Sequence, residues 1–157
     1  MGAIFNVFPL ILVPVLIYNI WAFLSTTGAS AREVREQLRA SIFKVPMASS
    51  EPAQAGVAGA MQSVEWAVSF GDLLVLISLL LLFIELLKST STGTSAIFNH
   101  ALSMLVFIIC LVEFLLHPAF ATSTFFFILV MSLLDVLAGV VVTIVSARRD
   151  VEFAGGH

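Results

Sequence analysis

The sequence alternates between long apolar runs and shorter polar segments. An apolar stretch of about 20 residues is enough to cross a bilayer as a helix, and each of the long runs approaches or exceeds that length. The runs cover approximately residues 3–24, 66–88, 96–117 and 123–147. Because the last two links between runs are short, successive helices there should be antiparallel neighbours. The pattern predicts an all-α integral membrane protein, a four-transmembrane-helix bundle forming one membrane domain over residues 1–157.

The first run contains Pro9 and Pro14, and each removes a backbone hydrogen-bond donor. A kink is therefore expected in this helix, which neighbouring helices would have to cover. A cleaved signal peptide is the competing interpretation. The run is long for that role and no basic residue precedes it, so we predict a permanent helix.

The polar segment 25–65 is expected to begin with a short amphipathic helix over Ser30 to Phe43. Val34, Leu38 and Ile42 recur at helical spacing and make a narrow apolar stripe, with arginines and glutamates on the other faces. Such a helix either lies on the membrane surface with its arginines against lipid phosphates, or folds as a solvated helix over the mouth of the bundle. Residues 47–63 are predicted to be irregular loop, and the polar tail 148–157 is predicted to be loose.

Composition supports the membrane class. The chain is 60% hydrophobic and 11% charged, whereas soluble domains carry about 25% charged residues. Its net charge is −3 and it has no basic tract, which argues against nucleic acid as a partner. The single cysteine, Cys110, lies inside an apolar run and cannot form a disulfide within the chain.

Small and polar residues within the last three runs recur at a spacing near 3.5 residues, which keeps them on one side of each helix. Gly71, Ser78 and Glu85 mark the second run; Ala96, Asn99, Ser103, Cys110, Glu113 and His117 the third; Ser132, Asp135, Gly139, Thr143 and Ser146 the fourth. In lipid it is such residues that face other helices. We therefore expect these polar seams to face inward and most Leu, Ile and Phe side chains to face lipid.

Ionisable residues inside a membrane are candidates for function. The candidate intramembrane polar seam consists of Asp135, Ser78, Glu85, Lys88, Ser103, Glu113, Asp72 and His117. Structural roles compete for most of the charged members. Glu85 can pair with Lys88 three residues later, Asp72 suits a helix N-terminus, and His117 can reach Glu113.

Asp135 lies deeper than the other acids. At about 1.5 Å per residue, it is about 18 Å from Ala147 at the end of its run. We predict that its side chain faces the bundle interior and is hydrogen-bonded to another helix, because an isolated carboxylate in hydrocarbon is very costly. Ser78 falls at a similar depth and is the expected partner.

No catalytic or cofactor-binding motif is visible. His100 and His117 invite a haem or metal interpretation, but their spacing points them to different faces of a helix, unlike the i, i+4 pair that metals favour. No cofactor, metal site or enzymatic activity is predicted.

The segments GDLLVLISLLLLFIELLKSTSTGTSAIFNHALSMLVFIICLVEFLL and ATSTFFFILVMSLLDVLAGVVVTI resemble a family of small, uncharacterised four-helix inner-membrane proteins of alphaproteobacteria. The resemblance covers about two-thirds of the chain and implies a bacterial inner (cytoplasmic) membrane location, with no activity or residue role to transfer. Lys88, Arg148 and Arg149 abut the ends of predicted spans, which favours both termini in the cytoplasm. The basic residues of the polar segment 25–65 weigh against this orientation.

Two functions remain open. The chain is either a structural or accessory subunit that self-associates or joins a larger membrane complex, or a small proton- or cation-conducting channel or transporter subunit that uses the intramembrane acids. The absence of catalytic motifs and of a sizeable soluble region favours the first, whereas acids at several depths favour the second.

Overall fold

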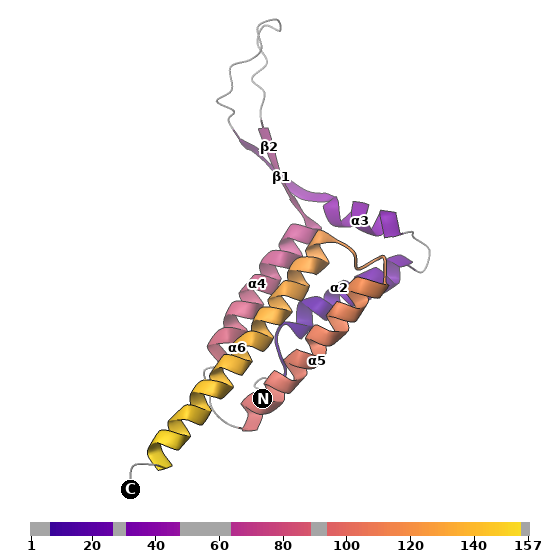
Figure 1. Cartoon of the computed structure of the whole chain (residues 1–157). Coiled ribbons are helices and arrows are strands. Elements are labelled where there is room, and N and C mark those ends of the chain that lie inside the picture. Colours follow the sequence, from indigo (N-terminus) through magenta and orange to yellow (C-terminus); the bar gives the residue numbers. More distant parts are fainter. Residues whose placement is uncertain (1–6, 27–30, 48–63, 89–93, 155–157) are drawn as a thin grey trace, which may run out of the picture.

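The computed structural model describes residues 7–26, 31–47, 64–88 and 94–154. Over these ranges the chain forms helices joined by one small antiparallel sheet (Figure 1). The helices are α2 (Leu12–Thr26), α3 (Ala31–Arg39), α4 (Phe70–Lys88), α5 (Thr94–Leu116) and α6 (Ser123–Ala154), and the strands are β1 (Ser41–Met47) and β2 (Val64–Ser69).

The bundle is organised around α6, which packs along both α4 and α5, while α2 contacts all three of these helices. Helix α3 lies across one end of the bundle, and the β1–β2 hairpin projects away from that end (Figure 1). We call this the α3 end, where α4 and α6 begin and α5 ends. The opposite end, where α4 finishes at Lys88 and α5 begins, is called the Lys88 end.

Three of the described helices are long and apolar enough to cross a membrane by length and composition: Phe70–Lys88, Ala96–Leu116 and Ser123–Val145. The first predicted span differs. Helix α2 has 15 residues, which at about 1.5 Å per residue gives about 22 Å, short of the bilayer's apolar core of about 30 Å. It starts only at Leu12, after Pro9, so the helix is interrupted at this proline rather than kinked.

The outer faces of the helices are apolar, as predicted, and the interior combines polar side chains with a buried apolar core that includes Tyr18, Phe125 and Ile128. The buried polar side chains of the described residues are Ser78, Glu85, Asn99, Ser103, Ser132 and Asp135, while large apolar side chains cover the outer faces. The prediction fails toward the helix ends, where His117 and Thr143 are exposed. Helix α6 extends past the Lys88 end (Figure 1), so fewer neighbours cover its last turns.

The sheet was not predicted. Residues 64–69 were assigned to the polar segment and the start of the second span, but they form β2 and pair antiparallel with β1, with Lys44 opposite Ala67 and Val45 opposite Trp66. Both strands are rich in β-branched and aromatic residues, which favour strands. An exposed ion pair of 2.9 Å between Lys44 and Glu65 crosses the hairpin. Most of the predicted loop at 47–63 lies outside the described residues.

The predicted amphipathic helix is present but shorter. Val34 and Leu38 of α3 are buried, as expected. Ile42 is instead 53% exposed, because the helix ends at Arg39 and Ile42 belongs to β1. The predicted loose tail is also partly wrong, since α6 continues to Ala154. Residues 148–154 include the good helix formers Ala, Arg and Glu and contain no Gly or Pro.

Candidate functional site

Glu85, a member of the polar seam, lies near the Lys88 end and is fully buried. Its Oε2 accepts a hydrogen bond of 2.8 Å from the backbone N–H of Leu10, and its Oε1 accepts one of 2.5 Å from Nδ2 of Asn99 on α5. The carboxylate therefore joins α4 to α5 and to the segment that precedes α2.

Lys88 completes this cluster, as the i, i+3 spacing predicts. Its Nζ lies 3.0 Å from Oε1 and 3.1 Å from Oε2 of Glu85. The same ammonium donates a hydrogen bond of 2.8 Å to the carbonyl oxygen of Phe8 and contacts Oδ1 of Asn99 at 3.4 Å. We call Glu85, Lys88 and Asn99 the Glu85 cluster.

The Glu85 cluster compensates for the break at Pro9. Where a helix stops, peptide groups lose their helical partners, and an unsatisfied peptide group in hydrocarbon costs several kcal/mol. The Phe8 carbonyl and the Leu10 N–H flank Pro9, and they are the groups bound by Lys88 and Glu85. Helix α2 then begins with Pro14 in its first turn, where a backbone donor is not needed.

Asp135 is held differently. Its side chain is 4% exposed and faces the bundle interior, as predicted. Its Oδ2 accepts a hydrogen bond of 2.6 Å from the hydroxyl of Ser103 on α5. The prediction that it is hydrogen-bonded to another helix is confirmed, whereas the predicted partner, Ser78, is wrong.

Ser78 is fully buried, but its hydroxyl donates to the carbonyl of Leu74 on its own helix, at 2.7 Å. Ser132, one turn from Asp135, behaves in the same way toward Leu129. A serine can satisfy its donor within its own helix, so depth alone does not identify a cross-helix partner.

His100 lies one turn from Ser103 and packs on Gly139 of α6. A Cβ atom at Gly139 would collide with the imidazole ring. The Nδ1 atom of His100 is buried and has no hydrogen-bond partner among the described residues. The glycine on the facing helix therefore admits the imidazole to the α5–α6 contact.

The remaining candidates lie toward the α3 end, where local structure explains each of them. Oε2 of Glu113 accepts a hydrogen bond of 3.2 Å from Asn19 on α2. Asp72 and Ser69 cap the start of α4 reciprocally: Oδ2 of Asp72 accepts from the Ser69 N–H at 2.9 Å, and the Ser69 hydroxyl accepts from the Asp72 N–H at 3.2 Å. Nδ1 of His117 accepts from the N–H of Ala119 in the α5–α6 link.

The structure thus divides the predicted seam among the Glu85 cluster, the Asp135–Ser103 pair and the contacts at the α3 end, while Ser78 is bonded within its own helix. The sequence did not indicate Asn99 and His100 as site residues, although Asn99 is one of the small and polar residues of the third run that were predicted to face inward. Among the described residues no group of three or more His, Cys, Asp or Glu side chains could hold a metal ion.

Comparison with known protein families, with curated proteins and with solved structures finds no match to this chain. The resemblance drawn from the sequence therefore stays a prediction.

Proposed function

We propose that the chain is a non-enzymatic, multi-pass membrane protein that acts as a structural or accessory subunit, in a homo-oligomer or within a larger membrane complex. In this proposal α2 and the residues before it complete a fourth span. The membrane is a bacterial inner membrane, and both termini are cytoplasmic.

The observation that carries the proposal is the use made of the buried polar groups. Glu85, Lys88 and Asp135 direct their hydrogen bonds to other elements of this same chain. Groups that are satisfied in this way stabilise one packing arrangement and are not free to bind a substrate. Large apolar side chains on α4, α5 and α6 are left facing outward, available to lipid or to the helices of a partner.

Native purification tests the proposal. The tagged full-length protein, extracted in a mild maltoside detergent, should elute as a defined homo-oligomer or with a larger membrane complex. A monomer that recruits no partner, with crosslinking in intact membranes giving the same result, would contradict the subunit role.

A proton- or cation-conducting role is the second candidate, and the α5–α6 contact favours it. Ser103 is bonded to Asp135, and His100, one turn from Ser103, packs on Gly139 of α6. Nδ1 of His100 lacks a partner among the described residues. Proton relays in membranes use such Asp and His side chains.

Flux measurements separate the two candidates. Proteoliposomes with wild type and Asp135→Asn should show the same background proton leak if Asp135 only packs, because an amide can still accept the hydrogen bond from Ser103. A wild-type flux that Asp135→Asn abolishes, with unchanged thermal stability, would replace the structural proposal with conduction.

A further inference from the structure

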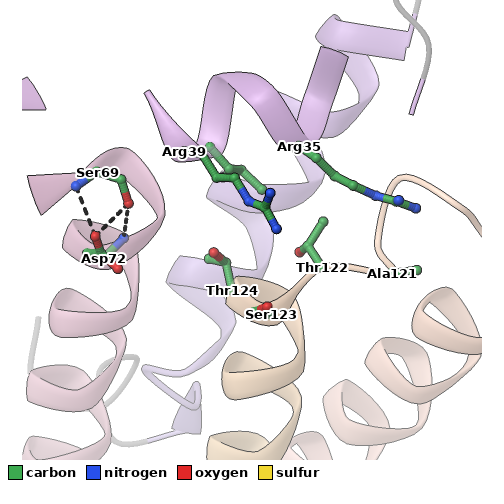
Figure 2. Close-up of a pocket in the computed structure, with 9 residues that line it drawn as sticks. Arg35, Arg39, Ser69, Asp72, Ala121, Thr122, Ser123 and Thr124 are labelled. Atoms are coloured by element: carbon green, nitrogen blue, oxygen red, sulfur yellow. Dashed lines mark hydrogen bonds between the residues drawn. The ribbon is translucent and has the colours of Figure 1, made fainter. Parts of the chain in front are cut away.

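An open pocket of about 330 Å³ lies at the α3 end, between α3 and the starts of α4 and α6 (Figure 2). Its lining residues are Arg35, Leu38, Arg39, Ser69, Asp72, Ala121, Thr122, Ser123 and Thr124. We propose that this pocket binds a phosphate group, and that the phosphate is presented by the headgroup of an anionic phospholipid.

The basic side chains come from one face of α3. Arg35 and Arg39 are four residues apart and therefore neighbours on the helix surface. Both are exposed, and neither forms an ion pair with the described residues. Arg32 is different, because its guanidinium is paired with Glu36 at 3.3 Å. Figure 2 shows Arg39 projecting over Thr124 and Arg35 projecting toward the α5–α6 link. Guanidinium groups bind phosphate oxygens through charge-assisted, often bidentate hydrogen bonds.

The opposite wall is the start of α6. Ser123 and Thr124 place hydroxyl groups there, beside a helix N-terminus whose dipole favours an anion. The hydroxyl oxygen of Thr122 is already used, since it lies 2.7 Å from Tyr18 Oη and accepts the N–H of Phe125 at 3.1 Å. Its role is to fix the first turn of α6.

Asp72 is the only acid in the lining, and its Oδ2 is held by the N–H and hydroxyl of Ser69. Two arginines against one carboxylate leave the pocket with a net positive charge. This balance distinguishes the pocket from the Glu85 cluster, where Lys88 and Glu85 neutralise each other.

The position of the pocket favours a lipid as the source of the phosphate. It opens at the end of the apolar helices, where Trp21 of α2 and Phe70 of α4 pack together with ring centroids 6.0 Å apart. Aromatic residues are enriched where headgroups meet the apolar core. This step rests on the membrane location included in the proposed function.

Ligand binding to the full-length protein in maltoside micelles tests the site. Native mass spectrometry would measure the Kd for dioleoyl phosphatidylglycerol and for dioleoylglycerol, which has the same chains without phosphate. Calorimetry would measure the Kd for inorganic phosphate. Wild type should bind phosphatidylglycerol at least about tenfold more tightly than dioleoylglycerol, the difference that charge-assisted contacts typically make.

Arg35→Gln/Arg39→Gln should weaken binding of phosphatidylglycerol by about tenfold or more, whereas Arg32→Gln on the same helix should leave the Kd within about twofold, since Arg32 is not part of the lining. Ser123→Ala, a small change at an exposed position, should weaken binding without affecting the fold. Equal affinity for the two lipids, or a double variant that binds as wild type does, would overturn the proposal.

If inorganic phosphate binds with the same dependence on the two arginines and phosphatidylglycerol does not, phosphate recognition stands and the lipid source is overturned. The result is independent of the purification experiment. A protein that recruits no partner would still be able to bind the headgroup, and a failed site would leave the subunit role intact.

Discussion

Glu85 and Asp135 are both acids buried among apolar helices, and the structure holds them in different ways. Glu85 binds an ammonium, a side-chain amide and a backbone N–H, which come from α4, α5 and the segment before α2. Among the described residues, Asp135 has a single cross-helix hydrogen bond, from Ser103. The Glu85 cluster satisfies backbone groups beside Pro9. The bond of Asp135 satisfies only the two side chains that form it. This difference predicts unequal costs of removal.

The largest effect is expected at Glu85. Glu85→Leu leaves the largely buried Lys88 without its counter-charge and the Leu10 N–H without an acceptor. Breaking a buried ion pair in this way costs about 3–5 kcal/mol. Unfolding in mixed detergent and dodecyl sulfate micelles would measure the loss. Glu36→Leu, at an exposed ion pair, is the matched control and should change the free energy of unfolding by less than about 1 kcal/mol. Equal losses for both variants would contradict the anchoring role of the Glu85 cluster.

Gly139→Ala should come next, with a loss of about 1–3 kcal/mol, because overpacking a closely fitted contact forces neighbours to move. The new methyl group would meet the His100 ring and push α5 from α6 near Asp135. Adding His100→Ala should restore most of the stability if this collision is the cause. If the double variant Gly139→Ala/His100→Ala is no more stable than Gly139→Ala alone, the strain lies elsewhere.

Removal of the Asp135–Ser103 hydrogen bond should cost less. Interhelical hydrogen bonds in membranes contribute about 0.6 kcal/mol on average and about 1.7 kcal/mol at most. Asp135→Leu and Ser103→Ala should each fall in this range, and Asp135→Asn below it. A double-mutant cycle measures their coupling directly. A loss at Asp135 as large as that at Glu85 would remove the contrast between the two acids.

The smallest effect is expected at Ser78. Its hydroxyl is bonded within its own helix, so Ser78→Ala removes no cross-helix contact and should change stability by less than about 0.5 kcal/mol. A loss comparable to that of Ser103→Ala would show that Ser78 contributes to the α4–α6 contact after all.

The sequence predicted much of this arrangement, because the spacing of polar residues along one helix shows which of its faces points inward. The spacing of Gly71, Ser78 and Glu85 was enough to find the inward face of α4. It was not enough to choose between Ser78 and Ser103 as the partner of Asp135. That choice depends on how α4 and α5 are rotated toward α6, which spacing along one helix does not determine.

The break at Pro9 and the β1–β2 hairpin were missed for a similar reason. Pro9 indicated a disturbed helix, but whether the chain kinks or stops depends on partners far along the sequence. Trp66 and its neighbours continue the apolar run of α4 in composition, although their strand pairing separates them from it.

The contacts around Pro9 also have a consequence for biogenesis. Leu10 and Phe8 are synthesised before their partners Glu85 and Lys88, which follow 75 and 80 residues later. Until then the peptide groups beside Pro9 lack these partners, and hydrocarbon would penalise them. On ribosome-bound chains truncated before α4, a cysteine introduced by Phe8→Cys should react with aqueous thiol reagents. No reaction would contradict the late insertion of this segment. A segment synthesised before α4 would then take its final place in the membrane only after α4 has arrived.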